Sequence, residues 1–253
     1  MKIAVCVKQV PSREWQPRLR DDGTWIREQD VTFELNEPDA YALEEALRLR
    51  ETHQGEVVVC AAGPARVQQV IREALARGAD RAIHVQDDRL GAADPSVVSA
   101  ALAAAMDGEA FDLVLTGLQS DDQGHGQTGV MLAAHLGLPH STIIMEIRIA
   151  DGALRVKREL EGGWFQWVSM PLPALLTIQS GINHLRYATL KGIMAAKKKD
   201  VRVVPMAEGL APTQEIVSLA VPARAKRTEL IGGPPAEAAR ELVRRLREEA
   251  KAL

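Results

Sequence analysis

The sequence is poor in cysteine and in aromatic residues, and it has no marked excess of either charge. Its 253 residues include two cysteines, Cys6 and Cys60, and 4% aromatic side chains, while Lys+Arg (31) nearly balance Asp+Glu (34) for a net charge of -3. Both cysteines lie in short apolar runs, which favours buried thiols over a disulfide framework. Without a basic excess, a nucleic-acid partner is not expected.

Long apolar runs are also missing. No run approaches the roughly 20 residues that a membrane-spanning helix needs, and so we expect no direct insertion into a membrane. The first residues enter a strand pattern at once, with no segment typical of a signal peptide before it. Together these features predict a cytoplasmic protein.

The common catalytic motifs are absent as well. The six histidines show no metal-ligand spacing, and no serine or cysteine stands in a nucleophile motif. Neither a P-loop nor a G-x-G-x-x-G sequence after the first strand is present. We therefore expect no metal site and no set of catalytic residues.

What the sequence does contain is a regular alternation of strand and helix patterns. Buried-strand runs at 3–7, 56–62, 81–85 and 111–116 are separated by helical patterns, among them 65–77, 95–106 and 127–136. Asn36 stands at the predicted start of the first helix. Short connections between such elements predict an α/β fold with a doubly wound, mostly parallel sheet.

After residue 146 the pattern changes. Residues 154–159 and 165–169 resemble two strands of an antiparallel hairpin, following a predicted turn at 150–152, and 175–178 is one more short strand. From 205 to 235 the periodicity is weak, and 235–253 has the pattern of a charged amphipathic helix. We predict a nucleotide-binding domain at 1–204 and a C-terminal arm at 205–253 that packs on a partner subunit.

A polar, glycine-rich loop at 117–126 follows the fourth strand and leads into the helix at 127–136. In open α/β sheets, ligands bind where strands end, near the point at which the strand order reverses. Free amides at a helix start suit a phosphate, and Gln127 and Thr128 add side-chain donors. The alternative is that this stretch is only a helix cap and a solvated loop.

One ordered set of segments resembles the beta subunits of electron-transfer flavoproteins. These segments are 156–163 (VKRELEGG), 172–177 (LPALLT), 186–190 (RYATL), 193–194 (IM) and 196–199 (AKKK). Residues 7–11, 43–49, 74–80 and 127–129 are similar to the family too. The resemblance extends from Met1 to about Val204.

The resemblance implies a heterodimer with an alpha subunit that holds most of a shared FAD. Electrons pass from acyl-CoA dehydrogenases of fatty acid oxidation to a membrane quinone oxidoreductase, and the beta subunit binds AMP structurally. Carried over by position, the cofactor-binding residues are Cys6, Asn36, Ala62, Gly117, Gln119, Asp122, Gln123, Gly126, Gln127, Thr128 and Gly129. The segment that docks the dehydrogenase contains Arg186, Tyr187, Leu190, Ile193 and Met194, with Leu190 as its apolar anchor.

Two other functions stay open at this stage. One is a bifurcating relative, in which the same pocket holds a second FAD that reacts with NADH; Thr128 favours AMP, because that group tends to have valine at this position. The other is a stand-alone module that binds an adenine nucleotide, against which the long C-terminal arm argues.

Overall fold

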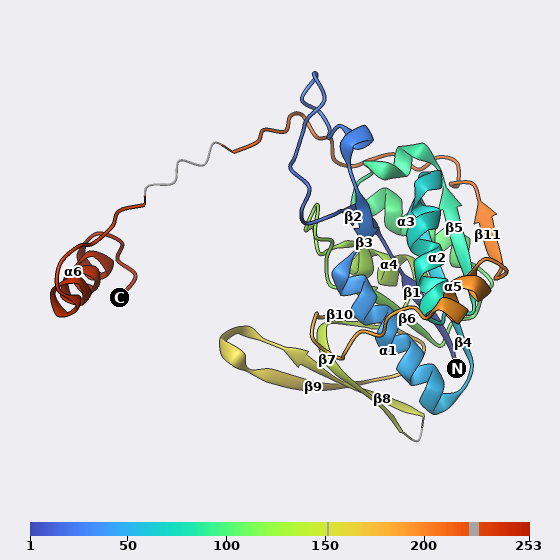
Figure 1. Ribbon diagram of the computed structural model, residues 1–253. Helices are drawn as coiled ribbons and strands as arrows, with labels where there is room; N and C mark the ends of the chain where they lie inside the picture. The colour runs from blue at the N-terminus through green and yellow to red at the C-terminus, as the bar shows by residue number, and fades with distance from the viewer. Residues whose placement is uncertain (151, 223–227) are drawn as a thin grey trace. The chain divides into compact units, whose positions relative to one another are not determined.

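Two compact units make up the chain, Met1–Leu219 and Ala220–Leu253. The computed structural model describes residues 1–150, 152–222 and 228–253 (Figure 1). The strands are β1 (Lys2–Cys6), β2 (Gln9–Pro11), β3 (Phe33–Leu35), β4 (Glu56–Gly63), β5 (Arg81–Gln86), β6 (Leu113–Gly117), β7 (His140–Ala150), β8 (Ala153–Glu159), β9 (Phe165–Met170), β10 (Ala174–Ile178) and β11 (Val201–Val204). The α-helices are α1 (Glu37–His53), α2 (Gln68–Arg77), α3 (Pro95–Met106), α4 (Thr128–Leu136), α5 (Leu190–Ala196) and α6 (Pro235–Glu248).

A nine-stranded sheet forms the centre of the first unit, in the order β11-β5-β4-β1-β6-β10-β7-β8-β9. The pairs from β11 to β7 are parallel, whereas β7–β8 and β8–β9 are antiparallel. Strands β2 and β3 form a separate antiparallel pair. The strand order reverses at β1, since β4 lies on one side of it and β6 on the other.

Helices cover both faces of the parallel part. Leu43 and Leu47 of α1 and Ile71 of α2 belong to the hydrophobic cluster on one face, and Leu102 of α3 and Leu132 of α4 belong to the cluster on the other. Strand β1 alternates between them, with Ile3 and Val5 in the first cluster and Ala4 and Cys6 in the second. Burial on both faces explains why this strand is a continuous apolar run.

The predicted fold class is confirmed: the sheet is doubly wound and mostly parallel, it carries an antiparallel hairpin, and the chain ends in a helix. The hairpin β8–β9 extends the main sheet and projects from it in Figure 1. The predicted turn at 150–152 falls between β7 and β8, and its residue Asp151 lies outside the described residues.

Some boundaries differ from the prediction. The last helix ends at Glu248 and not at Leu253, while α5 and β11 were not predicted. The predicted arm begins within the first unit, where Met206 is buried and Thr213 donates a hydrogen bond to Asp94. Residues 223–227 of that arm lie outside the described part of the chain, and its predicted contact with a partner stays a prediction.

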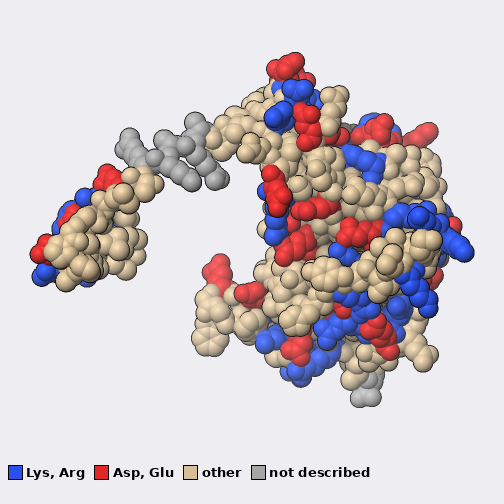
Figure 2. All heavy atoms as spheres, in the orientation of Figure 1, with Lys and Arg blue, Asp and Glu red and all other residues tan. Residues whose placement is uncertain are grey.

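The surface of the chain carries charge of both signs, as the visible face in Figure 2 shows. Among the helices that the structure describes, none combines the length and the apolar character that crossing a membrane requires.

Candidate functional site

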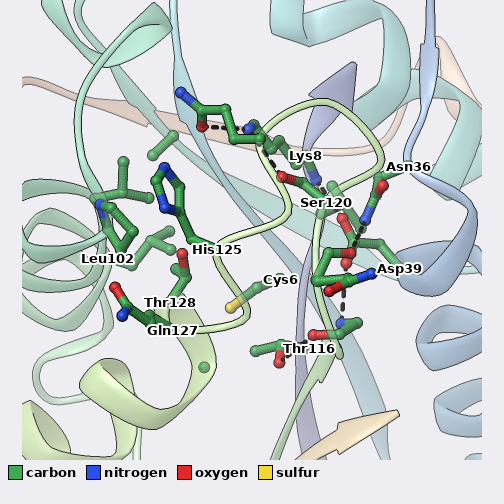
Figure 3. A pocket seen from close by; sticks show the side chains of 18 of the residues that line it. Cys6, Lys8, Asn36, Asp39, Leu102, Thr116, Ser120, His125, Gln127 and Thr128 are labelled. Atoms are coloured by element: carbon green, nitrogen blue, oxygen red, sulfur yellow. Dashed lines mark hydrogen bonds between the residues drawn. The ribbon is translucent and has the colours of Figure 1, made fainter. Parts of the chain in front are cut away.

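A pocket opens beside the ends of β1 and β6, lined by residues from both strands and from the loops that follow them. Because β1 is the strand at which the order reverses, the pocket occupies the position at which ligands bind in open α/β sheets. Figure 3 shows its lining side chains.

Most of the predicted cofactor-binding residues come together here. Those that line the pocket are Cys6, Asn36, Ala62, Gly117, Gln119, Gln123, Gly126, Gln127, Thr128 and Gly129. Asp122 is not among the lining residues. Its carboxylate accepts a hydrogen bond from Lys8 Nζ at 2.8 Å, and so it acts on the pocket through that lysine.

The start of α4 faces the pocket with unpaired amides. No side chain caps the helix at Gln127, and no protein acceptor within the described residues meets the amides of Thr128, Gly129 and Val130. Gly129 permits close packing of the helix, since a Cβ atom there would lie 2.6 Å from Thr116 Oγ1. The result is a group of free donors at the positive end of a helix dipole, which suits an anion.

The start of α1 fixes the opposite wall of the pocket. Asn36 stands at the predicted start of this helix but does not cap it with its side chain. Its Nδ2 atom instead donates to Gln119 O at 3.0 Å, and its Oδ1 atom accepts from the Asp121 amide at 2.9 Å. The amide side chain therefore holds the loop that follows β6.

Asp39 joins the ends of three elements. Its carboxylate accepts from the Lys8 amide at 2.8 Å and from the Gly117 amide at 2.9 Å. Burial raises the pKa of Asp39 to about 7, although these amide donors lower it. The contacts tie α1 to the carboxyl ends of β1 and β6, and so they set the width of the pocket.

Lys8 is a cation at the pocket that is already paired. Its Nζ atom donates to Asp122 and to Gln123 Oε1, each at 2.8 Å, and to Ser120 Oγ at 3.3 Å. Burial raises the pKa of Asp122, but Lys8 lowers it overall below its ordinary value. The lysine thus holds the loop in place while Asp122 neutralises its charge.

Both thiols are buried, as the apolar runs predicted. Burial raises the pKa of Cys6 well above its ordinary value and that of Cys60 to about 12. Cys6 lines the pocket as a protonated, apolar wall and not as a nucleophile. No group of three or more metal-ligating side chains gathers within the described part of the chain.

The lining also contains Leu118, Ser120 and His125 of the predicted loop at 117–126, and Val7 and Thr116 at the ends of predicted strands. The lining residues that the sequence did not single out are Lys8, Asp39, Leu90, Gly91, Ala93, Pro95, Val98 and Leu102. Lys8 directly follows a predicted strand, a position that marks it as a candidate. Leu90 and Leu102 belong to segments that only the folded chain brings to the loop.

The predicted docking segment forms a second, separate feature. Tyr187, Leu190 and Met194 are 89%, 82% and 60% exposed, and Ile193 is also exposed. Arg186 differs, because its side chain is paired with Glu44 and Glu51 of α1. The structure thus exposes four of the five predicted residues, while the fifth is paired with α1.

Comparison with known proteins gives consistent matches. The family model for the electron transfer flavoprotein domain matches residues 23–208. The chain is 41% identical to the electron transfer flavoprotein subunit beta of Methylophilus methylotrophus, over 82% of this chain and 80% of that protein. It is 36% identical to the human subunit beta, over 98% and 97%. It is 37% identical to the caffeyl-CoA reductase-Etf complex subunit CarD of Acetobacterium woodii, over 98% of each.

The fold and the pocket define a doubly wound α/β protein with a pocket at its switch point. Within that class, the chain belongs to the electron-transfer flavoprotein family, as a beta subunit. The resemblance found in the sequence is therefore confirmed.

Proposed function

We propose that the chain forms a heterodimer with an electron-transfer flavoprotein alpha subunit and carries electrons as part of it. The electrons come from acyl-CoA and related dehydrogenases of fatty acid oxidation and go to a membrane quinone oxidoreductase. The alpha subunit holds most of the FAD. This chain binds AMP as a structural ligand and docks the dehydrogenase, and it is an electron-carrier subunit and not an enzyme.

The observation that carries the proposal is the group of unpaired amides at Thr128, Gly129 and Val130. A phosphate monoester supplies the oxygen acceptors that these amides lack. The pocket also combines polar groups at Asn36 and Gln123 with apolar side chains such as Leu102. These residues fit AMP.

In this assembly the FAD, when bound, supplies the one- and two-electron chemistry. The residues of this chain bind the AMP and position the docking surface for the dehydrogenase. The start of α4 holds the adenylate, Asp39 and Asn36 keep the pocket walls together, and the exposed segment around Leu190 contacts the dehydrogenase. A bound nucleotide stabilises the folded state by mass action, and so AMP acts on this chain as a structural ligand.

The second candidate is a bifurcating subunit with a second FAD in the same pocket. The similarity to a subunit of a caffeyl-CoA reductase-Etf complex supports it. Thr128 favours AMP over this candidate. The two candidates are distinguished by extracting and counting the nucleotides bound to the purified heterodimer, because AMP and FAD can be identified separately.

The side chains of Gln127 and Thr128 test the site directly. In the co-expressed heterodimer, Gln127→Ala/Thr128→Val should bind AMP about 10- to 100-fold more weakly, since a hydrogen bond to a charged group contributes about 1.5–3 kcal/mol. AMP retained after gel filtration measures this, with Gln29→Ala, which is exposed and outside the pocket, as the control. Unchanged AMP content in the double variant would refute the assigned site.

A further inference from the structure

The segment that carries the docking residues has no regular structure where it leaves the sheet. Between the end of β10 at Ile178 and the start of α5 at Leu190, the backbone forms neither helix nor strand. Within the described chain, no hydrogen bond joins a backbone group of residues 180–188 to another backbone group. The position of this stretch therefore depends on its side chains.

Some apolar side chains of this stretch are partly buried against the core. Ile182, Leu185 and Ala188 pack against the cluster that includes α1. Asn183 is buried, and its Nδ2 atom donates to Tyr41 O at 3.2 Å and to Glu45 Oε2 at 3.0 Å. These contacts attach the first half of the stretch to α1.

Arg186 makes the largest set of polar contacts in the stretch. Its Nε and Nη2 atoms donate to Glu44 at 2.7 and 3.0 Å, and its backbone amide donates to the same carboxylate at 3.2 Å. Nη1 and Nη2 also donate to Glu51 at 2.6 and 3.2 Å. The Glu44 side chain is only 7% exposed, which makes this pair stronger than an ordinary surface ion pair.

The other end of the segment is attached to α2. Gly192 allows α5 to approach closely, because a Cβ atom there would lie 2.3 Å from Ala76 O. The Thr189 side chain caps α5 by accepting from the Gly192 amide at 3.0 Å, and Arg72 donates to Ala196 O at 2.7 Å. Arg186 thus lies between the two attached ends of the segment and directly precedes Tyr187. Its ion pairs attach this middle part to α1.

We propose that Arg186, held by Glu44 and Glu51 of α1, is a positioning residue that keeps Tyr187 and Leu190 in the conformation that docks the dehydrogenase. This inference rests on the proposed docking role of Leu190. Arg186 itself makes no contact with the dehydrogenase in this scheme. Because Arg186 orders the segment before docking, the free-energy cost of ordering it is not added to the cost of binding. This is the general effect of preorganisation.

The test uses the purified heterodimer as electron acceptor for an acyl-CoA dehydrogenase. Arg186→Gln should raise the KM for the heterodimer roughly tenfold and leave kcat within about twofold, because ordering a few side chains costs about one decade in affinity. Glu51→Gln removes a half-exposed partner and leaves Arg186 paired with Glu44, and it should raise the KM about threefold. FAD and AMP content should match the wild type in both variants.

A double-variant comparison separates positioning from general destabilisation. If Arg186 acts through Leu190, Arg186→Gln added to Leu190→Ala should change the KM by less than about twofold. Arg81→Gln is the matched control, because Arg81 also pairs with two carboxylates, Glu56 and Glu109, neither of which pairs with Arg186. Its KM should stay at the wild-type value even where its stability falls.

Each outcome decides a different claim. A wild-type KM for both Arg186→Gln and Glu51→Gln, together with a raised KM for Leu190→Ala, overturns the positioning role alone. The positioning role is also overturned if the KM increases of Arg186→Gln and Leu190→Ala multiply in the double variant. The same holds if Arg81→Gln raises the KM as much as Arg186→Gln does. A wild-type KM for Leu190→Ala overturns the docking role in the proposed function and the positioning role with it.

Discussion

At the scale of single residues, Gly117 sets the geometry of the pocket by having no side chain. It ends β6 and lies against the first turn of α1. A Cβ atom at this position would lie 2.3 Å from Asp39 Oδ1 and 2.7 Å from Pro38 Cβ. Any larger residue must push α1 away from the two strands that Asp39 joins.

Gly117→Ala should therefore lower the free energy of unfolding by about 1–3 kcal/mol, the usual cost of overpacking, and reduce the AMP content of the heterodimer. Urea denaturation of the isolated chain measures the first effect. Gly91→Ala serves as the control, because its Cβ atom would meet other atoms only at 3.7 Å. Equal stability of the two variants would contradict the close approach of α1.

The same scale shows what a sequence predicts poorly. Gln127 and Thr128 were identifiable because a glycine-rich loop leads into a helix there. Asp39 resembles an ordinary acidic residue in the first turn of a helix, and Lys8 resembles a solvated lysine. Their roles arise from partners 78 and 114 positions away along the chain, and no local pattern encodes such pairings.

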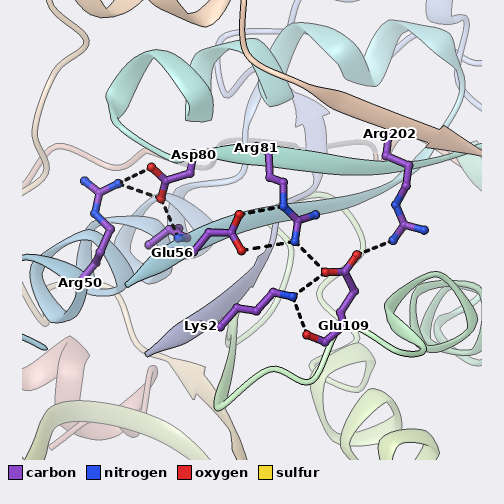
Figure 4. A network of polar contacts seen from close by, with 8 residues as sticks. Lys2, Arg50, Glu56, Asp80, Arg81, Glu109 and Arg202 are labelled. Carbon is purple, nitrogen blue, oxygen red and sulfur yellow. Dashed lines mark hydrogen bonds and ion pairs between the residues drawn. The ribbon is translucent and has the colours of Figure 1, made fainter. Parts of the chain in front are cut away.

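At the scale of elements, a polar network ties together the starts of several strands. Glu109 accepts from Arg81 of β5 at 2.6 Å, from Lys2 of β1 at 2.8 Å and from Arg202 of β11 at 2.8 Å (Figure 4). Arg81 also pairs with Glu56 of β4. The network lies at the ends of the strands opposite the pocket, and so it supports the sheet without entering the site.

This network predicts a defined response to acid. Hydrogen bonds from Arg81 and Lys2 lower the pKa of Glu109 to about 2. Because its folded-state pKa lies below the unfolded value of about 4.3, its contribution to stability is complete above that value and is lost as the pH falls toward 2. At neutral pH, Glu109→Gln should cost about 1–2 kcal/mol, allowing for solvent screening.

Denaturation of wild type and Glu109→Gln at a series of pH values checks this response. The difference in their free energies of unfolding should be constant between about pH 5 and 7 and should shrink between about 4.3 and 2. A difference that stays unchanged down to pH 2 would show that the charge of Glu109 contributes nothing.

Sequence periodicity predicted most of the helices and strands, but it did not predict the order of the strands in the sheet. The runs that became β1, β4, β5 and β6 were predicted because strands buried on both faces are continuously apolar. Strand β10 lies between β6 and β7 although it follows both in the chain, and parallel pairing across such distances has no local sequence pattern. Helix α5 was missed because seven residues after an irregular stretch carry too little periodicity.

At the scale of the whole molecule, α1 connects the two proposed functions of the chain. Its first turn holds the pocket through Asp39, and Glu44 and Glu51 further along it hold the docking segment through Arg186. One rigid helix therefore places the nucleotide site and the docking surface in a fixed relation.

The division into two units gives a further prediction. No residue of α6 is buried, and its Leu242 and Val243 remain about half exposed. An apolar stripe of this kind needs a partner surface. A chain ending at Leu219 should keep its melting temperature within a few degrees of the full chain, but it should form the heterodimer less tightly.

Thermal unfolding of the isolated chains and analytical ultracentrifugation with the alpha subunit test this expectation. A large fall in the melting temperature of the shortened chain would instead mean that Ala220–Leu253 stabilises the first unit. Undiminished heterodimer formation would remove the proposed contact of the arm with its partner.

The most direct test of the central claim is the cofactor content of the co-expressed, purified heterodimer. If the amides at the start of α4 hold an adenylate and the alpha subunit holds the flavin, extraction should yield one FAD and one AMP for each heterodimer. Two FAD molecules without AMP, together with reduction by NADH, would contradict this assignment.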